Sequence, residues 1–91
     1  MVYINLRLNV ADYEKWRAGF DANESNRKSA GSTGVNQFYR DVENLNNVTL
    51  VLEWDDADKA QAFLNDPHTK ESMDEAGVTG RPMVVAVQTK A

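Results

Sequence analysis

One residue type suited to proton transfer occurs only once in this sequence. His68 is the only histidine, and histidine is the residue type whose unperturbed pKa lies nearest neutrality. It follows Asp66 and Pro67, a pattern typical of a helix start with the aspartate as cap and the proline in the first turn. Helical geometry places His68 about 100° around the axis from the face that carries Thr69, Met73 and Ala76, which is expected to point inward. His68 is therefore either a general acid or base at the border of the core, or a surface or capping histidine.

A stripe along the first predicted helix offers a second candidate site. Tyr13, Trp16 and Phe20 recur at helical spacing, and Asn23 and Arg27 continue the same stripe. If the stripe faces the interior throughout, Asn23 and Arg27 form the polar end of a pocket and hold a carboxylate or quinone oxygen. If the helix instead runs past the edge of the sheet, both side chains enter solvent. The pattern leaves both interpretations open.

Aromatic side chains on the predicted strands could complete such a pocket. Trp54 ends one strand, where it could wall a pocket for a flat aromatic molecule or belong to the core. Tyr39 and Arg40 are neighbours on another strand and face opposite ways, so only one of them can line a given pocket.

Composition excludes several kinds of chemistry. The chain has no cysteine, which excludes disulfides, a thiol nucleophile, zinc ribbons and iron–sulfur clusters. The sequence contains no glycine-rich phosphate loop, Ser–His–Asp set or metal-ligand cluster, so it predicts neither a metal nor a cofactor. The net charge of -4 and the scattered basic residues argue against nucleic acid as a partner. Because no apolar run approaches about 18 residues and no signal pattern opens the chain, we expect a cytoplasmic protein without a membrane partner.

The length of the chain limits the architecture that it can form. The 91 residues, 42% of them hydrophobic and 26% charged, predict one globular domain spanning residues 1–91. A chain of this length buries only about 60–65% of the surface that its unfolded form exposes. Its core is therefore small, and oligomerisation is a common remedy.

The pattern of residue types predicts the elements that must position these side chains. Residues 2–10 alternate strictly between aliphatic and polar, which indicates a strand with one apolar face. Further along the chain we predict a helix from Asp12 to Gly31, strands at residues 35–41 and 48–54 joined by an Asn-rich turn, a helix over residues 57–76 interrupted at Asp66 and Pro67, and a strand at residues 82–89. The order βαββαβ predicts an α+β, ferredoxin-like fold. Its four-stranded antiparallel sheet has the order 4-1-3-2 and carries the helices on one face.

The face of this sheet that the helices leave open predicts a homodimer. It is half apolar and half polar, which suits a surface where two sheets meet better than it suits free water. We expect an Arg7–Glu53 ion pair inside it, with a catalytic dyad as the alternative. The side chains expected on this face are Tyr3, Asn5, Arg7, Asn9, Thr49, Val51 and Glu53, joined by either Val85 and Val87 or Val84 and Ala86.

Several segments spread over nearly the whole chain carry a family resemblance. They are Asp12-Tyr13-Glu14-Lys15-Trp16, Arg27-Lys28-Ser29-Ala30-Gly31, Tyr39-Arg40-Asp41, Leu52-Glu53-Trp54-Asp55, Ala62-Phe63-Leu64-Asn65-Asp66-Pro67 and Ala76-Gly77-Val78. Together they resemble the dimeric α/β-barrel superfamily, and within it the antibiotic-biosynthesis-monooxygenase-like domains. The resemblance implies a homodimer whose two sheets close into one barrel with the helices outside. It also implies a ligand site within each subunit, between sheet and helices.

The resemblance implies a choice of functions. The superfamily contains cofactor-independent quinone-forming monooxygenases, haem-degrading enzymes, muconolactone isomerases, polyketide cyclases and many proteins of unknown role. The chain resembles most a cofactor-independent monooxygenase acting on a small aromatic or polyketide-like compound. The alternative is a non-catalytic dimer that binds a small ligand or is associated with stress. Whether the protein is an enzyme stays open, because the fold alone does not choose among these chemistries.

Comparison with the haem-degrading members brings in one more residue. Those enzymes pair an Asn on the first strand with a Trp on the third strand and a helical His ligand, and Asn5 and Trp54 match the first two. Met73 stands where the ligand histidine would be expected, and His68 comes too early on the helix, so haem is not implied. The resulting candidates are His68 and Asn5 as catalytic residues, and Trp54, Tyr39, Arg27 and Asn23 as substrate-binding residues.

Overall fold

The computed structural model describes the backbone of residues 1–91 and all side chains except those of Arg81, Pro82, Val84 and Val85. Along the chain the elements are β1 (Val2–Val10), α1 (Tyr13–Ala22), α2 (Glu24–Ala30), β2 (Ser32–Arg40), β3 (Asn47–Trp54), α3 (Ala57–Asn65), α4 (Pro67–Glu75) and β4 (Val78–Thr89).

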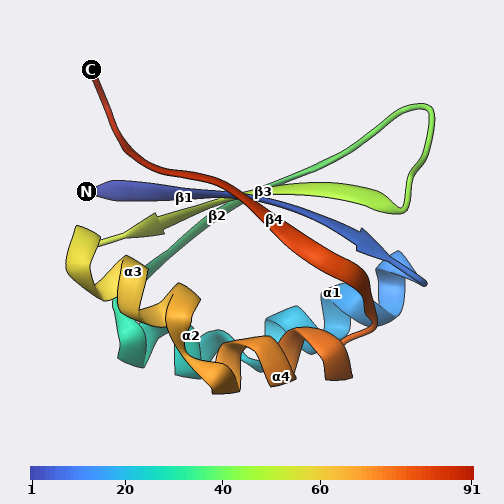
Figure 1. Cartoon of the computed structure of the whole chain (residues 1–91), viewed down its shortest axis with the longest axis horizontal. Coiled ribbons are helices and arrows are strands. Elements are labelled where there is room, and N and C mark those ends of the chain that lie inside the picture. The colour runs from blue at the N-terminus through green and yellow to red at the C-terminus, as the bar shows by residue number, and fades with distance from the viewer.

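The strands form one antiparallel sheet whose helices all lie on the same side (Figure 1). Its order, β2-β3-β1-β4, is the predicted order 4-1-3-2 read from the opposite edge. The chain therefore has the α+β, ferredoxin-like architecture that the sequence predicts. The other face of the sheet is left uncovered by any element of the chain (Figure 1).

The alternation of aliphatic and polar residues along β1 determines which face of the sheet carries the hydrophobic core. Its aliphatic residues face the helices and pair across the strands with aliphatic residues of β3, which extends one apolar surface over both central strands. The pairs are Ile4 with Leu52, Leu6 with Leu50, and Leu8 with Val48. Each of these side chains is at most 5% exposed. The predicted assignment of faces on both strands is confirmed.

The prediction of one continuous helix from Asp12 to Gly31 is wrong, because the structure has two helices there, α1 and α2. The chain leaves the helical conformation at Asn23, with φ -95° and ψ 11°, and resumes it at Glu24. The Asn23 side chain donates through Nδ2 to the carbonyl oxygen of Gly19 at 3.2 Å. Asparagine competes for backbone partners in this way, which favours helix ends over helix interiors. The break does not turn the stripe outward, since Arg27 on α2 is still buried.

Two strands are longer than predicted. β2 starts at Ser32, and its pairing with β3 is irregular between Ser32 and Asn36, where Gly34 has φ 86°. β4 starts at Val78, which pairs with Val10 on β1. The glycines at the start of each segment led us to predict turns there. In the structure, hydrogen-bonded pairing with the neighbouring strand continues past these glycines, because a β-bulge can accommodate an irregular residue within a paired strand.

The predicted Arg7–Glu53 ion pair is wrong. The register sets Arg7 opposite Thr49 and Glu53 opposite Tyr3, so the two charged residues are separated by four positions along β1, on the order of 13 Å. Arg7 instead forms an ion pair with Asp41, with 2.9 Å between Nη2 and Oδ2. Glu53 accepts a hydrogen bond from the Thr33 hydroxyl at 2.8 Å.

The fourth strand contributes to both faces. Ala86 pairs with Asn5 and so lies on the open face, whereas Val87 packs against the core. The predictions for the side chains of Val84 and Val85 lie outside the described residues.

Gly31 allows the chain to turn closely past Trp54, and this yields a first prediction. Gly31 has φ 123°, and a Cβ there would lie 2.7 Å from Trp54 Nε1 and 2.9 Å from Asp55 Oδ1. We expect Gly31→Ala to lower the free energy of unfolding by about 2–5 kcal/mol, from left-handed backbone strain and overpacking. The measurement is urea unfolding at one fixed protein concentration.

Gly77→Ala is the matched control. Gly77 has φ 88°, but a Cβ there would meet no atom within 4 Å. Its loss should be confined to the backbone penalty of about 1–2 kcal/mol. Equal losses for the two variants would contradict a steric role for the contact with Trp54.

Candidate functional site

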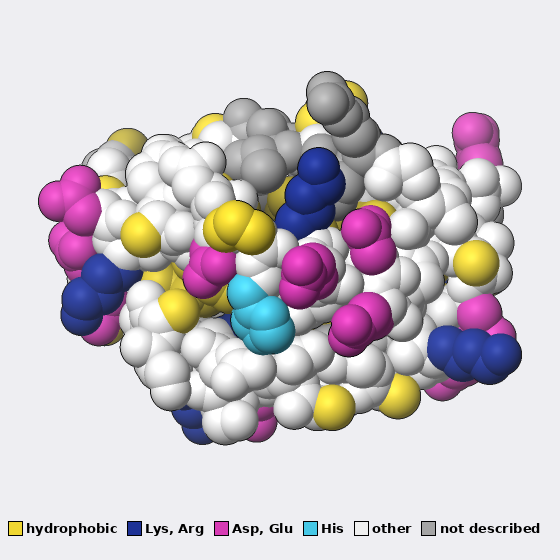
Figure 2. Space-filling model, turned by 60° about the horizontal axis from the view of Figure 1, so that its bottom comes forward, with side chains coloured by type: hydrophobic (Ala, Val, Ile, Leu, Met, Phe, Trp, Pro, Cys, Tyr) yellow, Lys and Arg dark blue, Asp and Glu magenta, His cyan; other side chains and the backbone are white. Residues whose placement is uncertain are grey.

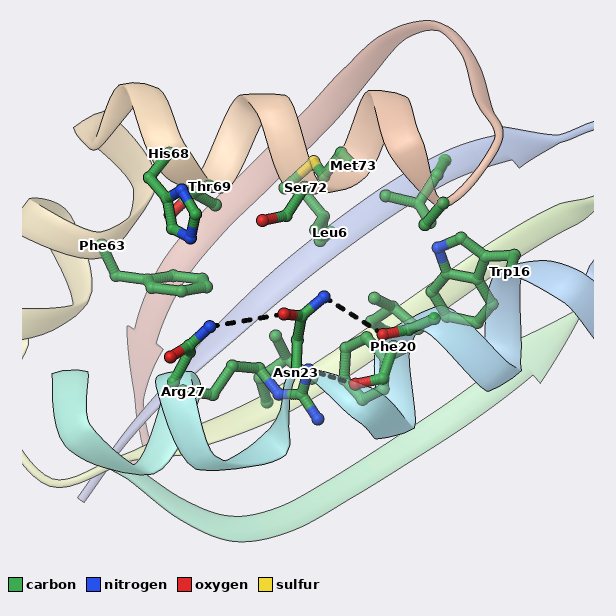
Figure 3. A pocket seen from close by; sticks show the side chains of 16 residues that line it. Leu6, Trp16, Phe20, Asn23, Arg27, Phe63, His68, Thr69, Ser72 and Met73 are labelled. Atoms are coloured by element: carbon green, nitrogen blue, oxygen red, sulfur yellow. Dashed lines mark hydrogen bonds between the residues drawn. The ribbon is translucent and has the colours of Figure 1, made fainter.

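A pocket lies between the helices and the covered face of the sheet. It encloses about 80 Å³, which is room for several water molecules, and it opens to solvent. Figure 2 shows a hollow with hydrophobic side chains inside it and His68 at its rim. In Figure 3 the pocket lies between α4 on one side and α1 and α2 on the other. Its apolar lining comprises Leu6, Leu8, Leu50 and Leu52 from the sheet and Trp16, Phe20, Phe63, Met73 and Ala76 from the helices.

Small residues let the helices approach each other along the pocket. A Cβ on Gly19 of α1 would lie 3.2 Å from the Cβ of Ala76, which caps α4. The large rings of Trp16 and Phe20, on the same helix as Gly19, line the same space. They therefore form walls of the pocket without filling it.

Arg27 supplies a buried cation to the pocket. It is 5% exposed, its Nη1 donates to the carbonyl oxygen of Phe20 at 2.6 Å, and its guanidinium carbon lies 3.5 Å from the centroid of the Phe20 ring. Its buried Nε has no hydrogen-bond partner among the described residues. Burial lowers the pKa of the Arg27 guanidinium, and the nearby carboxylates of Glu24 and Asp21 oppose this effect. An arginine still remains charged near neutrality.

Two amides line the pocket next to Arg27. Asn23 lies across the pocket from His68 and Ser72 (Figure 3). Its Oδ1 accepts a hydrogen bond from Asn26 Nδ2 at 3.4 Å, while its Nδ2 is held by Gly19. The helical stripe therefore faces inward at both Asn23 and Arg27, and the oxygen that they are expected to hold stays a prediction.

His68 lies at the rim of this pocket. Its backbone N–H donates to Asp66 Oδ1 at 2.9 Å, so Asp66 caps α4 and the imidazole is not needed for capping. The residue is exposed, yet its ring points from α4 toward the pocket, close to Phe63 (Figure 3). Thr69 and Ser72 add two hydroxyl groups on the same side.

The structure separates the other three predicted site residues from the pocket. Trp54 is fully buried behind Phe63, with ring centroids 4.6 Å apart, and its indole N–H donates to the carbonyl oxygen of Ala30 at 3.0 Å. Asn5 lies on the open face of the sheet, where its Nδ2 donates to Gln88 Oε1. Tyr39 is on that face too, opposite Thr49, and is 56% exposed. The layout of Asn5 and Trp54 around one ligand is therefore not formed within the subunit.

Sequence reasoning missed several residues of the pocket. Trp16, Phe20 and Phe63 belong to the core cluster or pack against it, and they line the pocket as well. Ser72 lies one helical turn after His68, and Asn26 lies one turn after Asn23, so the spacing of three or four residues was a usable signal.

The described side chains that line the pocket include basic groups but no acidic ones. The pocket lining contains Arg27 and His68 but no aspartate or glutamate among the described side chains. Among those side chains, no three His, Cys, Asp or Glu residues lie together as metal ligands would.

No helix in the described part of the chain is long and apolar enough to cross a membrane.

Comparison with solved structures identifies the fold. A proposed antibiotic biosynthesis monooxygenase from Bordetella bronchiseptica is 18% identical and superimposes with a TM-score of 0.76, covering 99% of this chain and 96% of that one. This is the fold of the antibiotic-biosynthesis-monooxygenase-like domains. SnoaB, a cofactor-independent oxygenase from Streptomyces nogalater, matches with a TM-score of 0.67 and 14% identity over 98% of this chain and 94% of its own. A conserved protein from Methanosarcina mazei matches with a TM-score of 0.59 and 18% identity over 99% of this chain and 92% of its own.

Sequence comparison adds nothing to this likeness. No family model matches the chain, and no curated protein does. At these identities, the monooxygenase-like domains share a fold with the chain, and the chemistry has to be argued from the pocket.

A stability measurement tests whether Arg27 is retained for structural reasons. We expect Arg27→Met to change the free energy of unfolding by less than about 1 kcal/mol, or to raise it. The lost hydrogen bond and stacking are offset by removal of a desolvated charge and its unpaired Nε. The Phe20 carbonyl keeps a donor, because Asn23 N lies 3.2 Å from its oxygen.

The control for that measurement is Leu50→Ala, which truncates a residue that is 2% exposed and should cost about 2–5 kcal/mol. A loss of that size for Arg27→Met would contradict the prediction and mark Arg27 as a structural residue.

Proposed function

We propose that this protein binds a small aromatic or polyketide-like molecule in the pocket and oxygenates it without a cofactor. The observation that carries the proposal is an apolar, partly enclosed pocket in which Asn23 at the junction of α1 and α2, Arg27 on α2 and His68 on α4 converge. Apolar walls with a few polar groups at one end are typical of sites for small ligands. The likeness in fold to SnoaB, a cofactor-independent oxygenase, supports the choice of reaction.

The proposed reaction demands little of the protein. A ring methylene flanked by a hydroxylated ring reacts with dioxygen, one oxygen atom becomes a carbonyl on that carbon, and the other leaves as water. The CH₂ group supplies all four electrons that reduce dioxygen, so no external reductant is required. The protein must orient the substrate and accept one proton as the substrate is activated.

Three residues would carry these tasks. His68 would accept the proton, because its ring is at the rim and its side chain is not used in capping. Asn23 and Arg27 would hold the substrate oxygen on which negative charge develops, and such groups stabilise charge most strongly where water is excluded. Trp16, Phe20 and Phe63 would pack against the ring.

A second function, ligand binding without turnover, is favoured by one observation. His68 is exposed, and the pocket offers no carboxylate among the described side chains to orient its ring. A binding protein needs the pocket but not the proton acceptor, so the two functions differ in the consequence of losing His68.

Replacing His68 separates these functions. We expect the protein to consume dioxygen with at least one member of a panel of anthrones and other hydroxylated aromatics that carry a ring methylene. His68→Gln should lower kcat by about 10²–10⁴ and leave KM within about threefold. The measurement is oxygen uptake together with absorbance of the quinone product.

Lys70→Gln is the control, because Lys70 is exposed on the same helix and does not line the pocket. Ligand binding without oxygen uptake would support the non-catalytic function. An unchanged kcat in His68→Gln would contradict the role of the imidazole.

We also propose that the protein is a homodimer formed by the open face of the sheet. Three of the large hydrophobic residues most exposed in the structure, Val35, Tyr39 and Met83, lie on this face and are 56–62% exposed. Around them lie neutral polar groups, the Arg7–Asp41 pair and the Glu53 carboxylate, which accepts a hydrogen bond from Thr33. A self-complementary mixture of this kind suits a two-fold interface, as the resemblance to dimeric α/β-barrel proteins also implies.

A single charge in the middle of the open face tests the dimer. Val51 lies between Asn5 of β1 and Gln37 of β2. We expect the wild type to sediment as two copies of the 10.2 kDa chain at micromolar concentration, and Val51→Glu to sediment as one copy, because a buried unpaired carboxylate is costly. Ala62→Glu, on the exposed side of α3, should remain dimeric. A monomeric wild type would contradict the proposal.

A further inference from the structure

The guanidinium of Arg27 is a charge without a counter-charge in the pocket. Every other pocket-lining side chain apart from His68 is neutral, and none of the described ones is acidic. None of the ion pairs among the described residues involves Arg27, whereas Arg7, Arg17, Lys28 and Lys59 each pair with a carboxylate. In a protein with a net charge of -4, a buried cation left out of this pairing is a distinctive feature of the site.

Burial makes this arrangement unfavourable in the free protein. Arg27 is 5% exposed and its Nε is buried without a partner. A desolvated charge lacking its hydrogen bonds costs free energy, and a bound group of opposite charge would recover it. The contacts that Arg27 does make, one backbone carbonyl and the face of Phe20, hold the guanidinium in position but do not neutralise it.

We propose that the ligand of this pocket is an anion, specifically an aromatic carboxylate whose carboxylate is bound by Arg27. The inference rests on the proposed small-aromatic pocket and narrows its ligand class from small aromatic molecules in general to aromatic acids. A guanidinium and a carboxylate are both planar and form paired, charge-assisted hydrogen bonds. The ring of the ligand then packs among Trp16, Phe20 and Phe63, which line the pocket beside Arg27.

Acidic residues on α4 do not oppose this assignment. Glu71, Asp74 and Glu75 are exposed and are absent from the pocket lining. Water and salt screen such charges over about 8–10 Å. The carboxylates of Asp21 and Glu24, which act on Arg27 from nearby, are exposed, lie outside the pocket lining and pair with Arg17 and Lys28. The charge that lines the pocket itself is therefore that of Arg27.

A pair of ligands matched in shape isolates the contribution of charge. 2-Hydroxybenzoate and 2-hydroxybenzamide differ in replacing one carboxylate oxygen by an amide nitrogen, and at about pH 7 only the first is an anion. Titration calorimetry of the wild type should show that the acid binds about ten- to a hundredfold more tightly than the amide, the range for one charge-assisted contact.

Measurements on variants test whether the preference for the acid comes from Arg27. In Arg27→Met the ratio of the two dissociation constants should fall to about one, mainly through weaker binding of the acid, and Arg27→Lys should retain part of the preference. Arg17→Met is the control, because Arg17 lies one helix earlier, stacks on Phe38 with 3.8 Å to the ring centroid, and does not line the pocket. Circular dichroism of each variant verifies that it is folded.

The outcomes distinguish this inference from the function on which it rests. Equal binding of acid and amide by the wild type would overturn the anion assignment while leaving a pocket for small aromatics. A preference for the acid that survives in Arg27→Met would overturn the assignment to Arg27. If neither compound binds to the wild type, both the assignment and the proposed small-aromatic pocket fail.

Discussion

The pairing of β1 with β3 is the interaction on which the rest of this structure depends. Ile4 opposite Leu52 and Leu6 opposite Leu50 create a continuous apolar surface across the two central strands, and every helix lies on that side of the sheet (Figure 1). Because side chains alternate along a strand, a shift of one position would move this entire set to the open face. The register therefore decides at once where the core lies and which polar residues are left on the other side.

The pocket exists because the small core does not fill all the space between the sheet and the helices. A chain of 91 residues has few large side chains with which to fill the space between one sheet and four short helices. Gly19 and Ala76 bring two helices together, while the rings beside them act as walls. The polar end is provided by α2, whose Arg27 would be an unfavourable component of a purely structural core. Stability spent on a buried charge is typical of binding sites.

The two faces of the sheet separate two roles. Asn23, Arg27 and His68 belong to the covered side, and Asn5 and Tyr39 belong to the open side. In the dimer that we propose, the second copy would cover the open face without reaching the pocket between sheet and helices. Assembly would then stabilise the sheet that carries the site, and the groups proposed to contact the ligand would all come from one subunit.

The sequence by itself determined the order of the elements, the covered face of the sheet and the cap of α4, because these depend on local periodicity and on short motifs such as Asp66-Pro67. It also placed Asn23 and Arg27 on one helical stripe, although not the break between them. Only the tertiary structure decided that this stripe faces a cavity, that Trp54 is enclosed behind Phe63, and that Arg7 pairs with Asp41 rather than Glu53. Those outcomes depend on register and on packing between elements far apart in the chain, which residue spacing does not encode.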